Sequence, residues 1–205
     1  MQKMLTVIQN NRVLYDYVLA DSWFSSTDNM KFIQKDLHKE FVFALKSNRL
    51  AALIFEDKLE GKSVPIDLLP LNEDSLISVY ITGLDFPVSL VKQVFTNKND
   101  SEGVLYLACS DSSSDYSQIT AIYQKRWRVE VFHKSLKQNA SLENSPTHVK
   151  KIQQNHFYAS IYAFVKLECF KMKNSMNHYA IQARSYINAM RASMQEQYTM
   201  REALA

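Results

Sequence analysis

The chain has 205 residues, of which 46% are hydrophobic and 22% charged, so it is long enough for one large or two small cores and is neither disordered nor fibrous. A formal net charge of +3 favours binding to polyanions only weakly. Evidence for nucleic-acid binding must therefore come from where the basic residues lie. Cys109 and Cys169 lack any CxxC or Cys/His spacing, which indicates reduced thiols and no zinc site. No stretch resembles a signal peptide or a membrane span, so we expect a soluble, cytoplasmic protein.

The first part of the chain alternates helical and strand patterns. Residues 2 to 12 predict a helix, and the following "LYDYVLADSWF" is rich in strand-forming residues and stops abruptly at Asp21. Ser25 followed by Asp28 fits the capping-box pattern, which predicts a helix from about residue 26 to 39. The apolar run "FVFALKS" then has the length of a strand. This order predicts an α/β sheet with parallel neighbours.

Helical periodicity disappears between residues 48 and 112. Short strand-like runs alternate there with turn residues, namely "LAALIFE", "SLISVYITGL", "VSLVKQVF" and "GVLYLAC". The segment "TNKNDSEG" is typical of a turn between two of them. These runs predict antiparallel hairpins, and we interpret the segment as a β-rich insertion.

The polar loop "SDSSSDYSQIT" supplies N-cap residues for a helix predicted over residues 116 to 138, and the chain after Pro146 is helical in pattern. At about 100° per residue, one narrow face of helix 116 to 138 carries an acid among cations, with a tyrosine at its end: Tyr123, Arg126, Glu130, Lys134 and Lys137. A separate apolar face, predicted to pack against a sheet, contains Ile122, Val129, Phe132 and Leu136. The charged face fits either solvated i,i+4 ion pairs or an acid placed among phosphate-binding cations.

Asp21 also has two interpretations. An Asp at the end of a strand is often turn chemistry, but ligands of open α/β sheets gather at the carboxyl ends of strands. Asp21 and Glu130 together could share Mg²⁺ or Mn²⁺, hard cations that prefer carboxylate oxygens. Glu130 and His133 have the Glu-x-x-His spacing of di-iron bundles, but no second copy exists. A Ser/His/Asp hydrolase is unsupported, because there is no G-x-S-x-G motif.

The spacing Y-x2-R-x3-E-x6-K, formed by Tyr123, Arg126, Glu130 and Lys137, resembles the YREK signature of a large group of bacterial insertion-sequence DDE transposases. The segment "YVLADSWF" resembles the part of those enzymes that carries the second catalytic Asp, and the likeness covers about residues 11 to 170. It implies a mixed ribonuclease-H-like α/β sheet with flanking helices, a β-rich insertion and C-terminal helices. The implied divisions are a partial core at 1–47, the insertion at 48–112, the Glu130 helix completing the core at 113–145, and a helical region at 146–205.

The resemblance also implies roles for the candidate residues. Asp21 and Glu130 would be the catalytic acids that bind Mg²⁺ or Mn²⁺, while Tyr123, Arg126 and Lys137 would contact the DNA end. Lys134 is a further cation on the same predicted face and a candidate phosphate contact. The implied partner is double-stranded DNA, as transposon ends and target, in a bacterial cytoplasm close to the nucleoid. Self-association is a further expectation.

Two features depart from the family pattern. Trp23 stands two positions after Asp21, where a small residue is common, and its role is open between core packing and base contact. The first catalytic Asp has no counterpart, since Asp16 is five positions before Asp21 and strand alternation sends it to the opposite face. We therefore expect an N-terminally truncated transposase in which the first three strands of the core are missing. The alternatives are a non-catalytic DNA-binding remnant and a helical protein-interaction module.

Overall fold

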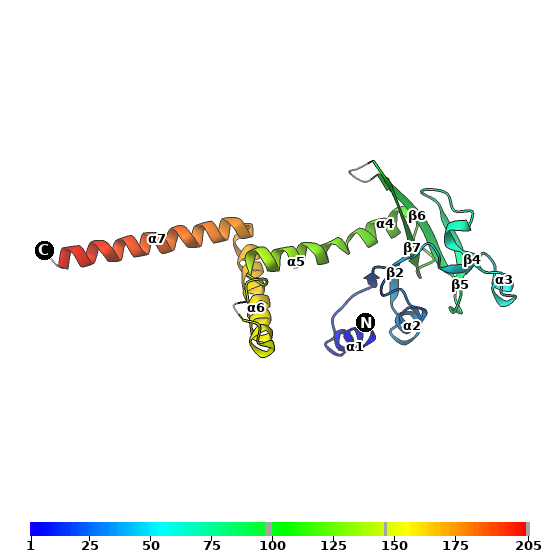
Figure 1. The fold of residues 1–205 in the computed structure, drawn as a ribbon, viewed down its shortest axis with the longest axis horizontal. Helices are drawn as coiled ribbons and strands as arrows, with labels where there is room; N and C mark the ends of the chain where they lie inside the picture. Colours follow the sequence, from blue (N-terminus) through cyan, green and yellow to red (C-terminus); the bar gives the residue numbers. More distant parts are fainter. Residues whose placement is uncertain (97–99, 146, 204–205) are drawn as a thin grey trace. The chain divides into compact units, whose positions relative to one another are not determined.

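The computed structural model describes residues 1–96, 100–145 and 147–203. These residues form two compact units, Met1–Trp127 and Arg128–Ala205. The first unit contains all the described strands and the second is helical (Figure 1). The turn predicted from "TNKNDSEG" lies partly outside the described residues.

A seven-stranded mixed sheet is the framework of the first unit, and its order is β1-β2-β7-β6-β5-β3-β4. β1 (Tyr17–Ala20) runs parallel to β2 (Glu40–Leu45), with Ala20 opposite Phe43. This pair confirms the parallel neighbours predicted from the helix–strand alternation. The remaining described pairs are antiparallel and involve β3 (Leu50–Ala52), β4 (Val64–Pro65), β5 (Leu76–Ile81), β6 (Val88–Thr96) and β7 (Glu102–Cys109).

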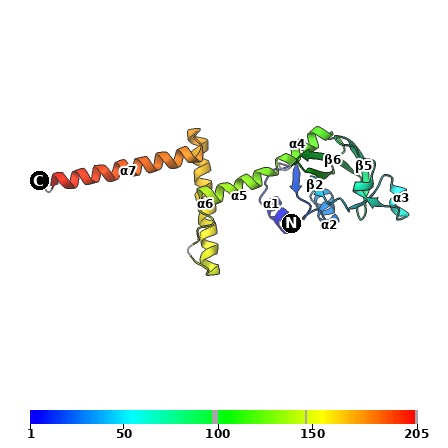
Figure 2. The same ribbon diagram turned by 45° about the horizontal axis from the view of Figure 1, so that its top comes forward.

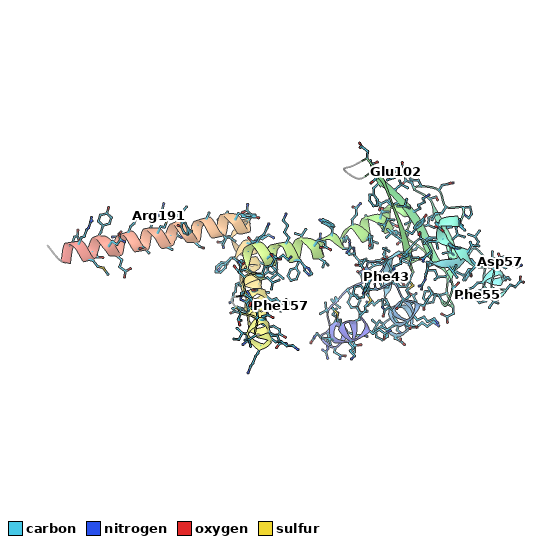
Figure 3. All side chains as sticks on the ribbon, in the orientation of Figure 1. Phe43, Phe55, Asp57, Glu102, Phe157 and Arg191 are labelled. Atoms are coloured by element: carbon cyan, nitrogen blue, oxygen red, sulfur yellow. The ribbon has the colours of Figure 1, made fainter. Side chains whose placement is uncertain are left out.

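Helices cover both faces of this sheet. α1 (Gln2–Asn10), α2 (Thr27–Lys31) and the π-helical turn η1 (Phe32–Asp36) lie on one side, and α4 (Tyr116–Gln124) lies on the other (Figures 1 and 2). Strand alternation supplies the two cores: Phe41 and Phe43 face the α1–α2 side, whereas Val42 packs toward α4. Figure 3 shows Phe43 within the first unit. The fold is thus a mixed α/β sheet with flanking helices.

The helix caps show where local sequence patterns succeed and fail. Asp115 accepts a hydrogen bond from the Gln118 N–H while the Gln118 side chain accepts one from the Asp115 N–H, so the polar loop before α4 provides a complete capping box. The capping box predicted at Ser25 is wrong. Ser26 is the N-cap of α2 and accepts from the Asn29 N–H at 3.2 Å, whereas Ser25 donates its hydroxyl to the Ser22 carbonyl.

The predicted strand "LAALIFE" is only half correct. β3 ends at Ala52, and α3 (Phe55–Leu59) begins two residues after Leu53. Glu56 and Asp57 in the first turn of α3 favour a helix, because carboxylates stabilise the positive end of the helix dipole. A short 3₁₀ turn, η2 (Ile66–Leu68), follows β4.

The single helix predicted over residues 116 to 138 is also wrong. α4 ends at Gln124, and α5 (Trp127–Asn139) begins after a turn at Lys125 and Arg126. At this turn the Lys125 and Arg126 N–H groups bond three residues back, to the carbonyls of Ile122 and Tyr123. This tighter spacing departs from 3.6 residues per turn and interrupts the helix between Tyr123 and Glu130.

The second unit holds most of α5, together with α6 (Lys150–Asn174) and α7 (His178–Ala203), in agreement with the helical pattern after residue 146. Leu136 is buried, and the ring of Phe132 packs edge-to-face against Phe164 of α6 at 5.0 Å between centroids. Packing of the apolar face of α5 against the sheet stays a prediction. Among the described residues, no helix has the length and apolarity needed to cross a membrane.

Candidate functional site

Asp21 stands directly after β1, at the carboxyl end of the parallel pair β1–β2. The strand forms because Val18 and Ala20 bury their side chains in the core on the α1–α2 side. Alternate residues face the other way, and Tyr17 and Leu19 pack in the core beneath α4. Asp21 continues that second series, so its carboxylate is directed to the face of the sheet that α4 covers.

A tight turn fixes the chain around this carboxylate. The Trp23 N–H donates to Oδ1 of Asp21 at 3.1 Å, and the Phe24 N–H donates to the Asp21 carbonyl at 3.2 Å. Trp23 is 83% exposed. Core packing is therefore not the role of Trp23, and base contact stays a prediction.

Tyr123 is buried beneath the face that Asp21 borders. It packs with Val42, Leu107 and Ile119, and the guanidinium carbon of Arg126 lies 5.6 Å from the centre of its ring, a cation–π distance. Burial raises the pKa of Tyr123, while the charge and hydrogen bonding of Arg126 oppose that shift and the negative charge of Asp21 adds to it. The structure thus brings together Asp21, Tyr123 and Arg126.

The other three candidates belong to α5 in the second unit. Glu130 lies in the first turn of α5 and is exposed, as is Lys134. Lys137 forms an exposed ion pair with Glu143 at 2.5 Å. Exposed pairs of this kind contribute about 1 kcal/mol or less, so a phosphate can replace Glu143 at little cost. The convergence of Glu130 with Asp21 stays a prediction.

The candidate metal ligands are carboxylates, which suit a hard divalent cation, but there are only two of them. Asp21 and Glu130 each offer carboxylate oxygens, the ligands that Mg²⁺ prefers, and Mg²⁺ commonly uses one or two carboxylates with water and phosphate oxygens as its other ligands. Within the described ranges, no group of three or more His, Cys, Asp or Glu side chains could hold a metal. By ligand chemistry each acid suits a hard cation that also takes phosphate and water oxygens, and the binding of one metal by both acids stays a prediction.

A second polar cluster lies at the opposite end of β1. The Tyr17 hydroxyl donates to Oδ2 of Asp111 at 2.5 Å, and the hydroxyls of Ser113 and Ser114 also donate to that carboxylate. These bonds, led by that of Ser113, hold the pKa of Asp111 well below its usual range, and the bond to Asp111 raises the pKa of Tyr17. The cluster ties the loop before α4 to β1 and so fixes the start of the helix that carries Tyr123.

Sequence reasoning missed two cations that share a cavity with the turn after Asp21. Lys46 and Arg49 lie in the segment between β2 and β3, and both line a cavity with Ser22 and Trp23. A usable signal was present, because "KSNR" follows the strand predicted to run parallel to the one ending at Asp21. The carboxyl ends of parallel neighbours meet at one edge of a sheet.

Residues 2–165 match the family model described as Transposase DDE domain. The chain belongs to the transposase DDE-domain family. None of the curated proteins compared with the chain matches it. The seven-stranded mixed sheet with helices on both faces is consistent with a ribonuclease-H-like transposase domain. Membership of the transposase DDE-domain family points to DNA transposition, DNA as the substrate and metal-assisted phosphodiester chemistry.

Proposed function

We propose that this chain acts in DNA transposition as a DDE transposase of the YREK group, cleaving DNA strands and transferring them with the help of Mg²⁺ or Mn²⁺. The observation that carries the proposal is the placement of Asp21 at the carboxyl end of β1, on the face where Tyr123 packs with Arg126 above its ring. An acid and a phosphate-binding cation therefore border the same edge of the sheet.

Each candidate residue has a role in this proposal. Asp21 and Glu130 would hold the metal, which supplies activation of the attacking oxygen and stabilisation of the leaving oxygen. Arg126, Lys134 and Lys137 bind the phosphates of the DNA end, Arg126 with the planar fork that suits phosphate oxygens. Contact of Tyr123 with the DNA end stays a prediction, and its buried ring also supports Arg126 and packs in the core beneath α4.

The third carboxylate of the DDE triad would come from a strand that pairs along β1. Among the described strands, β1 pairs only with β2, so its other edge presents backbone N–H and C=O groups. A strand added there would place an acid beside Asp21. The same edge supports self-association.

The proposed partner is double-stranded DNA, as transposon ends and target, in a bacterial cell at the nucleoid. We also propose the divisions 1–47 for the partial core, 48–112 for the β-rich insertion, 113–145 for the Glu130 helix and 146–205 for the C-terminal helices. A DNA-binding remnant without cleavage is the second candidate function, because Asp21 and Glu130 provide two acids where the DDE triad needs three.

The test measures duplex DNA binding against salt and the nicking of supercoiled plasmid in Mg²⁺ or Mn²⁺. The chain is assayed alone and after fusion to the three core strands of a YREK-group transposase. We expect salt-sensitive binding in both forms and metal-dependent nicking only in the fusion. Binding without nicking in both forms would select the non-catalytic remnant. A chain that binds no DNA even at low salt would leave only a role such as protein interaction through residues 146–205.

A further inference from the structure

A cavity of about 540 Å³ opens at the carboxyl ends of β1 and β2, where Ser22 and Trp23, the two residues after Asp21, line it. Its lining combines one indole, two cations and several hydroxyl and amide groups, including Trp23, Thr27, Lys46, Asn48, Arg49 and Thr82. None of the residues that line it is acidic. The volume lies within the range of small-molecule sites, and the charge of the lining selects an anion.

Arg49 is the strongest indication that an anion belongs in this cavity. The side chain is partly buried, and that burial lowers its pKa. Throughout the part of the chain that the structure describes, the side chains of Lys46 and Arg49 make no hydrogen bond or ion pair. A partly buried cation without a protein counter-ion is costly, and a phosphate with its several acceptor oxygens would satisfy it.

Trp23 adds a surface for a base at the same cavity. Its backbone N–H is held by the hydrogen bond to Asp21, while the residue is 83% exposed. Proteins that bind single-stranded nucleic acids combine exposed aromatic rings with cations. The bases stack on the rings, and the phosphates bind the cations. Trp23 follows Asp21 by two residues and its N–H bonds to the Asp21 carboxylate, so a nucleotide stacked on Trp23 would lie close to the turn that holds the acid.

Two elements that line the cavity approach each other closely at Gly83 and Thr27. Gly83 has φ +91, and a Cβ there would lie 3.1 Å from Cγ2 of Thr27. The turn after β5 therefore contacts the start of α2 at the position of Thr27 and Thr82, both of which line the cavity. This contact favours a cavity that exists before the ligand arrives.

We propose that this cavity binds one unpaired nucleotide of the DNA strand that reaches Asp21, with its phosphate on Arg49 and Lys46 and its base stacked on Trp23. The inference rests on the proposed function, since it names the part of the DNA that the site takes. The base must be unpaired, because a base within a duplex has both faces covered by its neighbours. Frayed or cut ends meet that condition.

The experiment uses the fluorescence of Trp23. The chain has two tryptophans, so Trp127→Phe leaves Trp23 as the sole one. Titration with a short oligothymidine should quench this fluorescence to saturation. An oligonucleotide of abasic sugar-phosphates should bind with much less quenching, because it retains the phosphates and lacks the bases.

Substitutions in the same background separate the phosphate and base contacts. Arg49→Ala and Trp23→Ala should each weaken oligothymidine binding about tenfold, measured by the anisotropy of a labelled oligonucleotide. Arg49→Lys keeps the charge and should bind within a few-fold of the parent, which separates lost charge from lost folding. The matched controls are Lys3→Ala on the exposed face of α1 and Phe95→Ala on β6, both expected within about twofold of the parent.

The outcomes distinguish this inference from the proposed function. Salt-sensitive DNA binding with unchanged Trp23 fluorescence, and with Arg49→Ala equal to the parent, would overturn the inference and leave the proposed function standing. Absence of binding to both single-stranded and duplex DNA at low salt would overturn both. Saturable quenching that Arg49→Ala weakens and Lys3→Ala does not would support the inference.

Discussion

The backbone N–H of Trp23 donates a hydrogen bond of 3.1 Å to Oδ1 of Asp21, so the chain turns back on the candidate catalytic carboxylate immediately after the strand. One carboxylate oxygen thus holds the turn. Asn at position 21 keeps an acceptor oxygen for this hydrogen bond but loses the negative charge. Asp21→Asn therefore tests the role of the charge in catalysis while the turn is kept.

Asp21→Asn and Glu130→Gln should each reduce metal-dependent cleavage to background in the strand-supplemented fusion, with DNA binding unchanged or stronger. Each substitution removes a charged metal ligand, and neither removes a phosphate contact. Glu102→Gln is the matched control, because Glu102 is exposed at the end of the β6–β7 hairpin (Figure 3). Plasmid nicking and DNA anisotropy measure the two effects. Full cleavage by either mutant would remove that residue from the proposed site.

Arg126→Ala together with Lys137→Ala should make DNA binding less dependent on salt. Each lost phosphate contact reduces the slope of log affinity against log salt by about 0.9, so the double variant should lose about two units. The measurement is duplex DNA anisotropy over a range of salt concentrations, with Lys3→Ala as the control for a loss of net charge. A slope equal to that of the parent would exclude both side chains from the DNA interface.

Tyr123 should contribute mainly to the stability of the fold. Tyr123→Ala empties a buried position of the core beneath α4, and large-to-small changes of this kind cost about 3–5 kcal/mol. Tyr123→Phe keeps the ring under Arg126 and should cost about 1 kcal/mol in urea unfolding. If the phenylalanine variant is as unstable as the alanine variant, packing of the ring is not the contribution of Tyr123.

Local patterns with direct physical causes were predictable from the sequence. The apolar runs ending at Asp21 and at Leu45 predicted the parallel pair β1–β2, because a strand between helical patterns needs a crossover connection. The helices after residue 146 and the polar loop before α4 followed from periodicity and capping chemistry. Asp21 was placed correctly at the carboxyl end of its strand.

Features that depend on one hydrogen bond or on distant packing were not predictable. The break at Lys125 and Arg126 replaces a normal helical turn with bonds three residues back, and neither residue disfavours a helix. Ser25 and Ser26 are equally good caps by chemistry, and the Ser25 bond to Ser22 decides between them. The cavity that Arg49 lines forms only when β1 and β2 pair in the observed register, and a single sequence does not specify that register.

The Tyr17–Asp111 cluster should make stability sensitive to acid. The folded pKa of Asp111 lies below its unfolded value, so its contribution is complete above about pH 4 and is lost as the pH falls further. Tyr17→Phe removes a hydrogen bond to a charged acceptor and should cost about 1–2 kcal/mol at pH 7. Urea unfolding from pH 7 to pH 2 should show the difference between wild type and Asp111→Asn shrinking below about pH 4. A constant difference would contradict the assignment.

Electron paramagnetic resonance of Mn²⁺, with the whole chain bound to duplex DNA, tests most directly whether Asp21 and Glu130 share one metal. Two acids without the third should bind Mn²⁺ weakly, and Asp21→Asn and Glu130→Gln should each lower that affinity about tenfold or more. The double variant should be no worse than either single one, because removing either ligand already loses the shared ion. Independent losses that multiply in the double variant, or an Asp21→Asn chain that binds Mn²⁺ as the wild type does, would contradict the account.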